Sequence, residues 1–366
     1  MKILYVTTIG GTMHFFQSLI QRLVQDGHTV DIACNDSVSK VAEFYYKLGC
    51  KVYPVQTSRS PLNKGNIHAI KQIKKIVENN HYDIVHCHTP VAAMCTRIAC
   101  RKARKQGTKV FYTAHGFHFY KGAPLRNWLL YYPVEKICSY FTDILITINQ
   151  EDFALATRAM KAKRVEYIPG VGIDLQKFKK NQVDRAAKRR ELNIPEDCTL
   201  LLSVGELNTN KNHETVVRAV ADLNVYYIIA GKGGLKEHLQ NVADELGIGE
   251  RVKLLGFRYD IQEIYSVADL FVFPSYREGL GLSAIEAMAC GLPLVVADNR
   301  GTRDFCVDGV NGFTCEPSNG EAFTRAIRSI LMDRKLREKM SEENQRAALK
   351  YDVLSINECM LKIYFG

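Results

Sequence analysis

The sequence predicts an α/β protein made of two Rossmann-like, doubly wound domains that face each other across a cleft. Its 366 residues suffice for two hydrophobic cores, since a domain takes roughly 100 to 200 residues. Short β-branched segments alternate with amphipathic helical patterns, which is typical of parallel sheets built from βαβ units. The alternation is interrupted once, where glycines and a charged segment follow Ile168, and then begins again.

Each predicted strand is a short β-branched or apolar segment, and a helical pattern follows most of them. The strands expected in the first domain are 3–7, 30–34, 51–55, 84–88, 109–113 and 144–148, and those in the second are 200–204, 226–230, 252–255, 270–273 and 294–297. We therefore predict domains at 1–180 and 181–345. The segment 346–366 has a helical pattern with an apolar end, and we expect it to pack back on the first domain.

Composition excludes several classes of protein. Hydrophobic residues make up 46% of the chain and charged residues 24%, as in ordinary globular proteins. No segment is apolar over roughly 18 consecutive residues, so we expect no membrane-spanning helix. The N-terminus lacks the apolar region of a signal peptide, and the eleven cysteines include no C-x-x-C pair or zinc spacing. These features predict a cytoplasmic protein with reduced thiols.

Positive charge is concentrated in the first half of the chain. Residues 1–180 contain 26 Lys and Arg against 12 Asp and Glu, whereas the second half has a small acidic excess. Such asymmetry indicates a polyanionic partner, either nucleic acid or an anionic membrane.

Two groups of basic residues, at 71–75 and 97–109, stand out in this half, and aromatic residues follow the second group. The basic residues are Lys71, Lys74, Lys75, Arg97, Arg101, Lys102, Arg104, Lys105 and Lys109, and the aromatic residues are Phe117, Phe119, Tyr120, Trp128, Tyr131 and Tyr132. Together with the leucines of the same segment, this combination favours a peripheral contact with an anionic membrane. We predict no nucleic-acid partner, because no nucleic-acid-binding motif is present. The alternative is that the aromatic residues belong to the core and the basic residues are merely solvated.

The most informative segment is 271–298, which reads as a strand, a loop, a helix and a second strand. Glu278 lies in the loop and Glu286 eight positions later, with Gly279 and Gly281 between them. These glycines let backbone amides approach a ligand closely, and a helix beginning near Leu282 directs its positive end to the same point. The pattern predicts a diphosphate site flanked by carboxylates.

Both acids also have structural interpretations. Ser283 and Glu286 have the spacing of a capping box at the start of a helix. Glu278 could be a solvated acid in a surface loop. The two acids and the glycines together are more specific than either acid alone.

In this segment the sequence resembles the family 4 retaining glycosyltransferases, in which E-x7-E follows a strand ending in Pro-Ser. The resemblance covers nearly the whole chain. It rests on Ala268-Asp269, Pro274-Ser275, Arg277-Glu278-Gly279, Glu286-Ala287-Met288-Ala289, Gly291-x-Pro293 and the segment 168–174. Two further segments, 88–90 (HTP) and 113–119 (TAHGFHF), resemble the capsule and exopolysaccharide branch of that family.

The resemblance implies a glycosyltransferase B-type fold, in which 1–180 binds the acceptor and 181–345 the nucleotide-sugar donor. Glu278, which contacts the donor sugar, Lys211, which contacts the phosphates, and His115, which lines the reaction centre, are the implied catalytic residues. Glu286 would accept hydrogen bonds from the ribose hydroxyls. The other implied donor contacts are the diphosphate-facing amides of Gly279, Leu280, Gly281, Leu282 and Ser283, the base-flanking Gly256 and Phe257, and Gly11 after the first strand.

One position departs from the family pattern. The family commonly has an arginine where this chain has Glu206, and a carboxylate cannot bind a phosphate. Arg258 or Lys232 could supply the missing cation. The glycines at 231, 233 and 234 follow a predicted strand and indicate either a turn or a ligand contact.

Histidines and aspartates give no sign of a metal site. His86, His88, His115 and His118 cluster at strand ends, where a buried structural histidine is the common case, and the period-two spacing of His86 and His88 makes a zinc site improbable. No two aspartates stand two positions apart, so a D-x-D metal clamp is absent. We therefore expect no metal and no cofactor.

The function that these observations predict is transfer of a sugar with retention of configuration by a hexosyltransferase-type enzyme. The donor is a nucleotide-diphosphate sugar, by resemblance UDP-linked, and the acceptor is a lipid-linked saccharide in surface polysaccharide biosynthesis. The expected place is the cytoplasmic face of the plasma membrane. Two alternatives remain, namely a non-hydrolysing nucleotide-sugar epimerase and a non-catalytic nucleotide-sugar-binding partner subunit.

Overall fold

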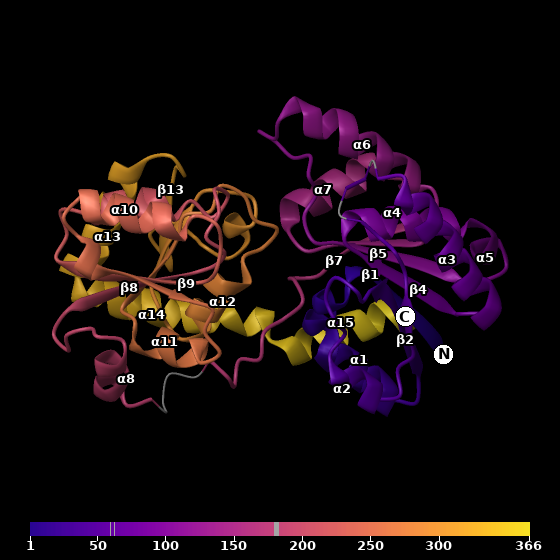
Figure 1. The fold of residues 1–366 in the computed structure, drawn as a ribbon, viewed down its shortest axis with the longest axis horizontal. Coiled ribbons are helices and arrows are strands. Elements are labelled where there is room, and N and C mark those ends of the chain that lie inside the picture. The colour runs from indigo at the N-terminus through magenta and orange to yellow at the C-terminus, as the bar shows by residue number, and fades with distance from the viewer. Residues whose placement is uncertain (59, 62, 179–182) are drawn as a thin grey trace. The chain divides into compact units, whose positions relative to one another are not determined.

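A computed structural model describes residues 1–58, 60–61, 63–178 and 183–366. The chain forms two compact units, one made of Met1–Val171 with Ile356–Gly366 and the other of Gly172–Ser355 (Figure 1). The predicted domain boundary between 180 and 181 lies outside the described residues. The structure passes from one unit to the other earlier, after Val171, and returns after Ser355 rather than after residue 345.

The first unit is a parallel sheet of seven strands in the order β3-β2-β1-β4-β5-β6-β7, with helices on its faces (Figure 1). Its elements are β1 (Lys2–Ile9), η1 (Gly10–Phe16), α1 (Gln17–Gln25), β2 (Thr29–Asn35), α2 (Glu43–Lys47), β3 (Val52–Pro54), α3 (Gly65–Asn80), β4 (Ile84–His88), α4 (Pro90–Ala99), α5 (Arg101–Lys105), β5 (Lys109–Ala114), α6 (Leu125–Ser139), β6 (Ile144–Thr147), α7 (Gln150–Ala159) and β7 (Arg164–Tyr167). The six predicted strands are all present. The central strands are buried on both faces, as continuous apolar segments in a covered parallel sheet must be.

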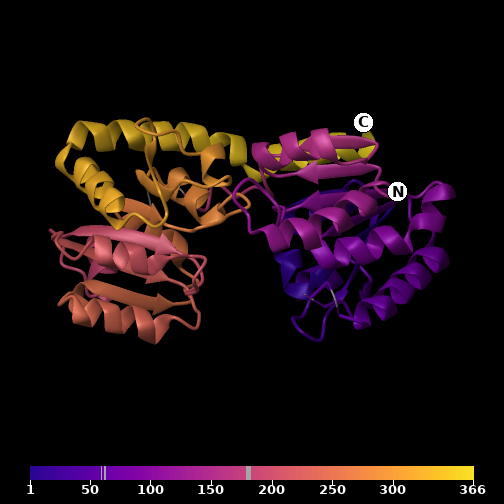
Figure 2. The ribbon, with the colours of Figure 1, turned by 90° about the horizontal axis from the view of Figure 1, so that it is seen from above.

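The end of the chain belongs to this first unit. The helix α15 (Val353–Phe365) brings the Tyr364 hydroxyl to 2.5 Å from the Tyr5 hydroxyl and 2.6 Å from His86 Nδ1. Asn357 donates to Ser18 Oγ at 2.8 Å. In Figure 2 the yellow end of the chain lies against the indigo and magenta elements of this unit. Residues 356–366 therefore complete the hydrophobic and polar core around β1 and β4.

The second unit is a parallel sheet of six strands in the order β10-β9-β8-β11-β12-β13. Its elements are α8 (Arg185–Glu191), β8 (Thr199–Val204), α9 (His213–Ala219), β9 (Val225–Ala230), α10 (Lys236–Glu245), η2 (Gly249–Arg251), β10 (Val252–Gly256), α11 (Ile261–Val267), β11 (Leu270–Phe273), α12 (Leu282–Ala289), β12 (Leu294–Ala297), η3 (Thr302–Asp304), β13 (Gly312–Cys315), α13 (Gly320–Met332), α14 (Arg334–Ala348) and η4 (Leu349–Tyr351). The five predicted strands are present. Edge strand β13 is additional, and its short sequence GFTC carries little β pattern.

Both sheets share one topological feature. The chain order reverses between β1 and β4 in the first unit and between β8 and β11 in the second. Loops at the carboxyl ends of two such neighbouring strands diverge, and ligands of open α/β sheets collect there. The segments after β8 and β11 are therefore the first place to look for a site. Among the described helices, none combines the length and the apolar character needed to cross a membrane.

Candidate functional site

The centre of the candidate site is an ion pair between two predicted residues, Lys211 and Glu278. Lys211 follows β8 and Glu278 follows β11, so both lie at the point of strand reversal. The Lys211 ammonium is 2.6 Å from Glu278 Oε1, and the side chains are 21% and 13% exposed. The ammonium also lies 5.2 Å from the centre of the Phe273 ring. The interpretation of Glu278 as a solvated acid is therefore wrong.

The loops that carry this pair are bonded to each other. The amide of Tyr276 donates to the Asn210 carbonyl at 2.9 Å, and the Asn210 side chain donates to the Arg277 carbonyl at 3.0 Å. Asn212, in a left-handed conformation at φ 55°, donates to the carbonyl of Pro274 at 3.1 Å. These bonds hold the backbone around Glu278 against the segment that carries Lys211.

The loop after β12 supports Glu278 from the other side, and the sequence patterns missed it. Asn299 donates to the Ser275 carbonyl at 2.9 Å and Arg300 Nε to the Glu278 carbonyl at 3.3 Å. A Cβ atom at Gly301 would lie 2.9 Å from Glu278 Cβ, so only glycine allows this approach. Their position in the sequence could have indicated a site, because all three residues follow the carboxyl end of a predicted strand.

Helix α12 begins beside this pair. Its N-cap is Gly281 at φ 102°, where a Cβ would come within 2.8 Å of the Phe273 ring. None of the described side chains caps this N-terminus, so its first amides remain available to an anion. The predicted diphosphate contacts from Gly279 to Ser283 lie in this turn, but the Leu280 side chain is buried and only its backbone could contact a ligand.

Glu286 lies one turn into α12 and does not cap it. Because Gly281 is the N-cap and Ser283 is already helical, the capping-box interpretation is wrong. The Glu286 carboxyl instead lies 2.9 Å from the hydroxyl of Tyr265 on α11, a residue that the sequence analysis missed. Burial raises the pKa of Glu286 to about 7, against a smaller lowering effect of the Tyr265 hydrogen bond.

The predicted base contacts lie at the end of edge strand β10. Gly256 has φ 69° and Phe257 is exposed, with the Lys232 ammonium 5.9 Å from its ring centre. The glycines after β9 allow their loop to pack closely against the backbone of the loop after β8. A Cβ at Gly231 would lie 1.8 Å from the Gly205 carbonyl oxygen, and one at Gly233 would lie 2.3 Å from that of Leu207.

The identity of the second phosphate cation stays a prediction. Arg258 contacts Asp260 and Glu191, each at 2.6 Å, so its charge is already neutralised by two carboxylates. This engagement counts against Arg258 as a donor-binding residue. Lys232 is exposed and forms no ion pair within the described part of the chain. Glu206 is exposed as well and accepts a hydrogen bond from Asn208.

In the first unit, His115 lies one residue beyond β5 and beside His88 at the end of β4. His115 Nε2 is 3.2 Å from His88 Nδ1, and burial lowers the pKa of His115 to about 4 and that of His88 well below its usual range. Both rings are therefore neutral near pH 7. Gly11 is exposed in η1, and a Cβ there would meet Ser39 Oγ at 2.6 Å. In the described residues, no three His, Cys, Asp or Glu side chains gather to hold a metal.

The predicted membrane-facing residues are partly wrong. Phe117 and Phe119 are buried, and Arg97 is only 1% exposed because it pairs with Glu135 at 2.8 Å inside the unit. Trp128, Tyr131 and Tyr132 pack against the same core. The apolar side chains that α6 and its C-terminal end expose are others: Leu125, Leu129, Leu130, Ile137 and Tyr140.

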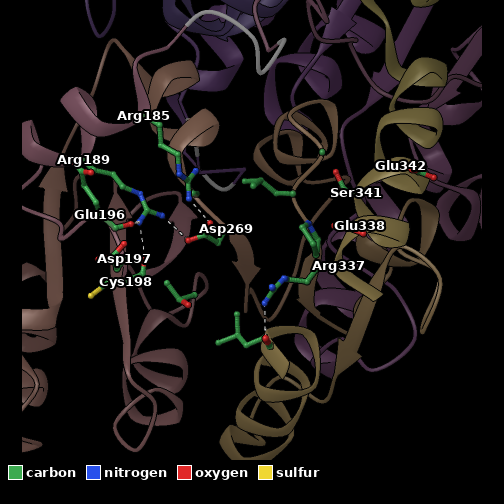
Figure 3. Close-up of a pocket in the computed structure, with 16 residues that line it drawn as sticks. Arg185, Arg189, Glu196, Asp197, Cys198, Asp269, Arg337, Glu338, Ser341 and Glu342 are labelled. Carbon is green, nitrogen blue, oxygen red and sulfur yellow. Dashed lines mark hydrogen bonds and ion pairs between the residues drawn. The ribbon is translucent and has the colours of Figure 1, made fainter. Parts of the chain in front are cut away.

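A hollow of about 520 Å³ lies at the opposite edge of the second sheet from the Lys211–Glu278 pair. Its walls include the residues just before β11 and β12 and the start of β8, which are the amino ends of these strands. Figure 3 shows Arg185 and Arg189 directed at Asp269, and both distances are short, 2.5 and 2.7 Å. Both arginines are therefore already paired with a carboxylate.

Comparison with known proteins decides the family. The family described as Glycosyl transferases group 1 matches residues 184–347, and Glycosyl transferase 4-like matches residues 2–149. EpsD of Bacillus subtilis, whose name assigns it to the glycosyltransferases, is 40% identical over 319 residues, which are 85% of this chain and 84% of that protein. The protein belongs to the glycosyltransferases. The epimerase alternative is thereby removed.

Two other similarities extend this result. A galactosyltransferase of Escherichia coli, named for transfer from UDP-Gal to α-D-GlcNAc-diphosphoundecaprenol, is 29% identical over 74% of this chain and 73% of its own. The structure of Anabaena HepE in complex with UDP has a TM-score of 0.82 and 21% identity, and it covers 100% of this glycosyltransferase and 99% of HepE. The two-domain B-type fold that the resemblance implied is therefore confirmed.

Proposed function

We propose that this glycosyltransferase moves a sugar from a UDP-linked donor to a lipid-linked saccharide in surface polysaccharide biosynthesis. The observation that carries the donor side is the Lys211–Glu278 pair beside the uncapped N-terminus of α12. A cation, a carboxylate and the N-terminal amides of a helix together form a site for a diphosphate and its sugar. The E. coli relative, named for a UDP-linked donor and a polyprenol-linked acceptor, supports the choice of substrates.

In this proposal the residues act on charge that develops as the donor breaks down. The bond from the anomeric carbon to the phosphate oxygen breaks, and its electron pair stays on the leaving diphosphate. The Lys211 ammonium and the first amides of α12 stabilise that charge. Glu278 keeps the ammonium in place at 2.6 Å and is positioned to accept hydrogen bonds from the donor sugar.

The proposed reaction has one nucleophile, the acceptor hydroxyl, and forms no covalent intermediate with the protein. We propose that the acceptor hydroxyl attacks the face from which the diphosphate leaves and passes its proton to a phosphate oxygen, so that configuration is retained. Lys211 and the helix N-terminus carry the charge compensation, so we propose that transfer needs no divalent metal.

Nucleotide binding gives the first test. We expect UDP, among UDP, GDP, ADP and CMP, to raise the melting temperature by several degrees at about 100 times Kd, because a ligand of the native state stabilises it by mass action. The shift is expected to persist in excess EDTA. In Glu286→Ala, binding is expected to weaken about 10- to 100-fold, since hydrogen bonds to a charged group contribute about 1.5 to 3 kcal/mol each.

The matched control for this experiment is Glu237→Ala, an exposed glutamate in the first turn of α10. This variant is expected to bind UDP like the wild type. A shift that EDTA abolishes and magnesium restores would contradict metal independence. A larger shift with GDP than with UDP would contradict the choice of base.

The proposed access to a lipid-linked acceptor is argued from an exposed apolar ridge on α6. Leu125 is 73% exposed and Leu129 is 70% exposed, and Ile137 continues the four-residue spacing on the same helix. Lys121 and Arg126 are exposed close to Leu125. Apolar side chains flanked by cations suit the boundary between anionic headgroups and acyl chains. We propose that the protein sits peripherally on the cytoplasmic face of the plasma membrane through this ridge, where a lipid-linked acceptor lies.

Vesicle sedimentation tests the ridge. We expect binding to phosphatidylglycerol-containing vesicles, weaker binding to pure phosphatidylcholine, and at least about a tenfold loss in a Leu125→Glu/Leu129→Glu double variant, because each leucine contributes about 1.5 to 3 kcal/mol when buried. Ile67→Glu, an exposed position on α3, is the control and should bind like the wild type. Binding to DNA without binding to anionic vesicles would contradict the membrane assignment.

A further inference from the structure

The buried hydroxyl of Tyr265 lies between two oxygen atoms that both accept hydrogen bonds. It is 2.9 Å from Glu286 Oε2 and 2.9 Å from the carbonyl oxygen of Ser283. A tyrosine hydroxyl has one proton and can donate to only one of them in full. At 2.9 Å the other contact needs a proton of its own, and the carboxyl of Glu286 is the only one of these three groups that can supply it.

We propose that Glu286 is held as a neutral carboxylic acid in the unliganded protein, donating to the Tyr265 hydroxyl, which donates to the Ser283 carbonyl, and that donor binding releases this proton. Tyr265 is thus a positioning residue for the donor site. The inference rests on the proposed role of Glu286 in binding the ribose. A diol presents two O–H donors, and an ionised carboxylate accepts both, whereas the neutral acid can accept at one oxygen only.

The surroundings of Glu286 favour the neutral form. Tyr265 is fully buried, and the rings of Phe178 and Phe271 lie 5.8 and 5.7 Å from its ring. The titratable groups that face this pair are the two themselves and, one turn further along α12, Cys290. No lysine or arginine within the described residues pairs with Glu286. Burial raises the pKa of Glu286 to about 7, which agrees with a shared proton.

Proton balance on binding is simple. The O–H bond of Glu286 breaks, the proton leaves to buffer, and the two carboxylate oxygens accept the ribose hydroxyls. Oε1 makes no hydrogen bond within the described part of the chain and is free for the first of them. The Tyr265 proton stays on Tyr265 and can turn from Ser283 to Oε2. Because the ionised form binds, affinity rises as the pH rises through about 7.

Calorimetry with UDP-glucose measures this proton directly. UDP-glucose is the probe because its diphosphate has no monoester group titrating near pH 6. In buffers of different ionisation enthalpy at pH 7 we expect release of about half a proton per ligand bound, and an increase in affinity of about tenfold from pH 6 to pH 8. Glu286→Gln is expected to release no proton and to lose the pH dependence.

The variant Tyr265→Phe tests the role of the hydroxyl. Because the Tyr265 hydrogen bond lowers the pKa of Glu286 against the larger effect of burial, its removal raises that pKa, and proton release at pH 7 is expected to increase above half a proton per ligand bound. Proton release equal to that of the wild type would show that Tyr265 does not control the Glu286 proton and would overturn its role as a positioning residue. Tyr227→Phe, another buried tyrosine whose hydroxyl lies 2.8 Å from Ser203 Oγ, is the control and should match the wild type.

Infrared difference spectroscopy on the wild type gives a second readout that needs no folded Tyr265 variant. A carbonyl band of a protonated carboxyl is expected to disappear when UDP-glucose binds and to be missing in Glu286→Gln. Binding of UDP-glucose with neither proton release nor loss of this band would overturn the inference and leave the proposed function standing. Failure of every uridine nucleotide to bind would overturn the proposed function, and the inference with it.

Discussion

Glu278→Gln is expected to lower kcat by about 10²- to 10³-fold with a smaller effect on the donor KM. The amide keeps the shape of the side chain but removes the negative charge that holds the Lys211 ammonium at 2.6 Å. A phosphate-stabilising cation that is no longer placed loses most of its effect on the leaving group, and the loss of one such group costs about this factor. The measurement is transfer of labelled sugar from the UDP-sugar with the largest thermal shift to lipid acceptors in membranes.

The control for Glu278 is Glu214→Gln. Glu214 pairs with Arg218 at 2.7 Å on α9, also in the second unit, but both side chains are more exposed. Its removal should leave kcat and the melting temperature nearly unchanged, because exposed pairs contribute about 0 to 1 kcal/mol. Undiminished transfer by Glu278→Gln would remove Glu278 from the mechanism, and undetectable transfer by the wild type with intact UDP binding would favour the non-catalytic partner subunit.

Glu135→Leu is expected to lower the free energy of unfolding of the first unit by about 3 to 5 kcal/mol. It leaves the charge of Arg97 buried without its partner, and a buried charge that loses its partner costs about this much. Arg97 is held from three sides, by Glu135 at 2.8 Å, by the Ala93 carbonyl at 3.0 Å and by the Tyr112 ring at 4.2 Å. Urea unfolding followed by the single tryptophan, Trp128 on α6, measures the loss.

A double-mutant cycle tests whether the charge is the cause. Arg97→Met/Glu135→Leu should unfold close to the wild-type urea concentration, because a buried ion pair replaced by apolar side chains of similar volume is often neutral in stability. Glu78→Gln, which removes exposed pairs with Lys74 and Lys102, is the surface control and should change little. Equal destabilisation in the double variant and in Glu135→Leu would show that packing rather than charge determines the effect.

The strands of this fold could be predicted because each is a short apolar segment, and an apolar segment indicates by itself that it is buried. β4, β11 and β12 occupy the predicted residues, and the other predicted strands differ by one or two residues at their ends. β13 could not be predicted, because Gly312 and Thr314 interrupt the apolar pattern at the edge of the sheet. The transition after Val171 was also hidden. Gly172 has φ 79° and packs on Val353, a contact between segments that are far apart in sequence.

The site was predictable where one loop carries its own chemistry. Glu278 and the glycines after it lie within a few residues of each other, so the pattern is visible in the sequence. Arg300 bonds to that loop and Tyr265 to the helix after it, each from about twenty residues away in sequence. The sheet topology brings these residues together, and hydrophobic periodicity carries no information about such contacts. The capping-box prediction failed for a related reason, since Gly281 already occupies the N-cap and the Glu286 carboxyl bonds to α11.

The membrane-facing residues show the limit of composition. Hydrophobicity and charge predict that Phe119 and Arg97 contact something, but they do not tell a lipid from a protein core. Phe119 packs inside the first unit, and Arg97 finds its counter-charge in Glu135. The leucines of α6 lie in the same segment as the predicted aromatic residues, and they are the side chains that this segment exposes.

The return of the chain to its first unit has a consequence for the order of synthesis. The ribosome makes residues 1–171 before the second unit and residues 356–366 after it. Until Tyr364 has emerged, the Tyr5 hydroxyl and His86 Nδ1 lack the partner that they have in the folded protein. The second unit can fold while translation continues, as domains generally do, whereas the first can be completed only afterwards. A chain that stops short of α15 therefore has a defective first unit, however complete its second unit.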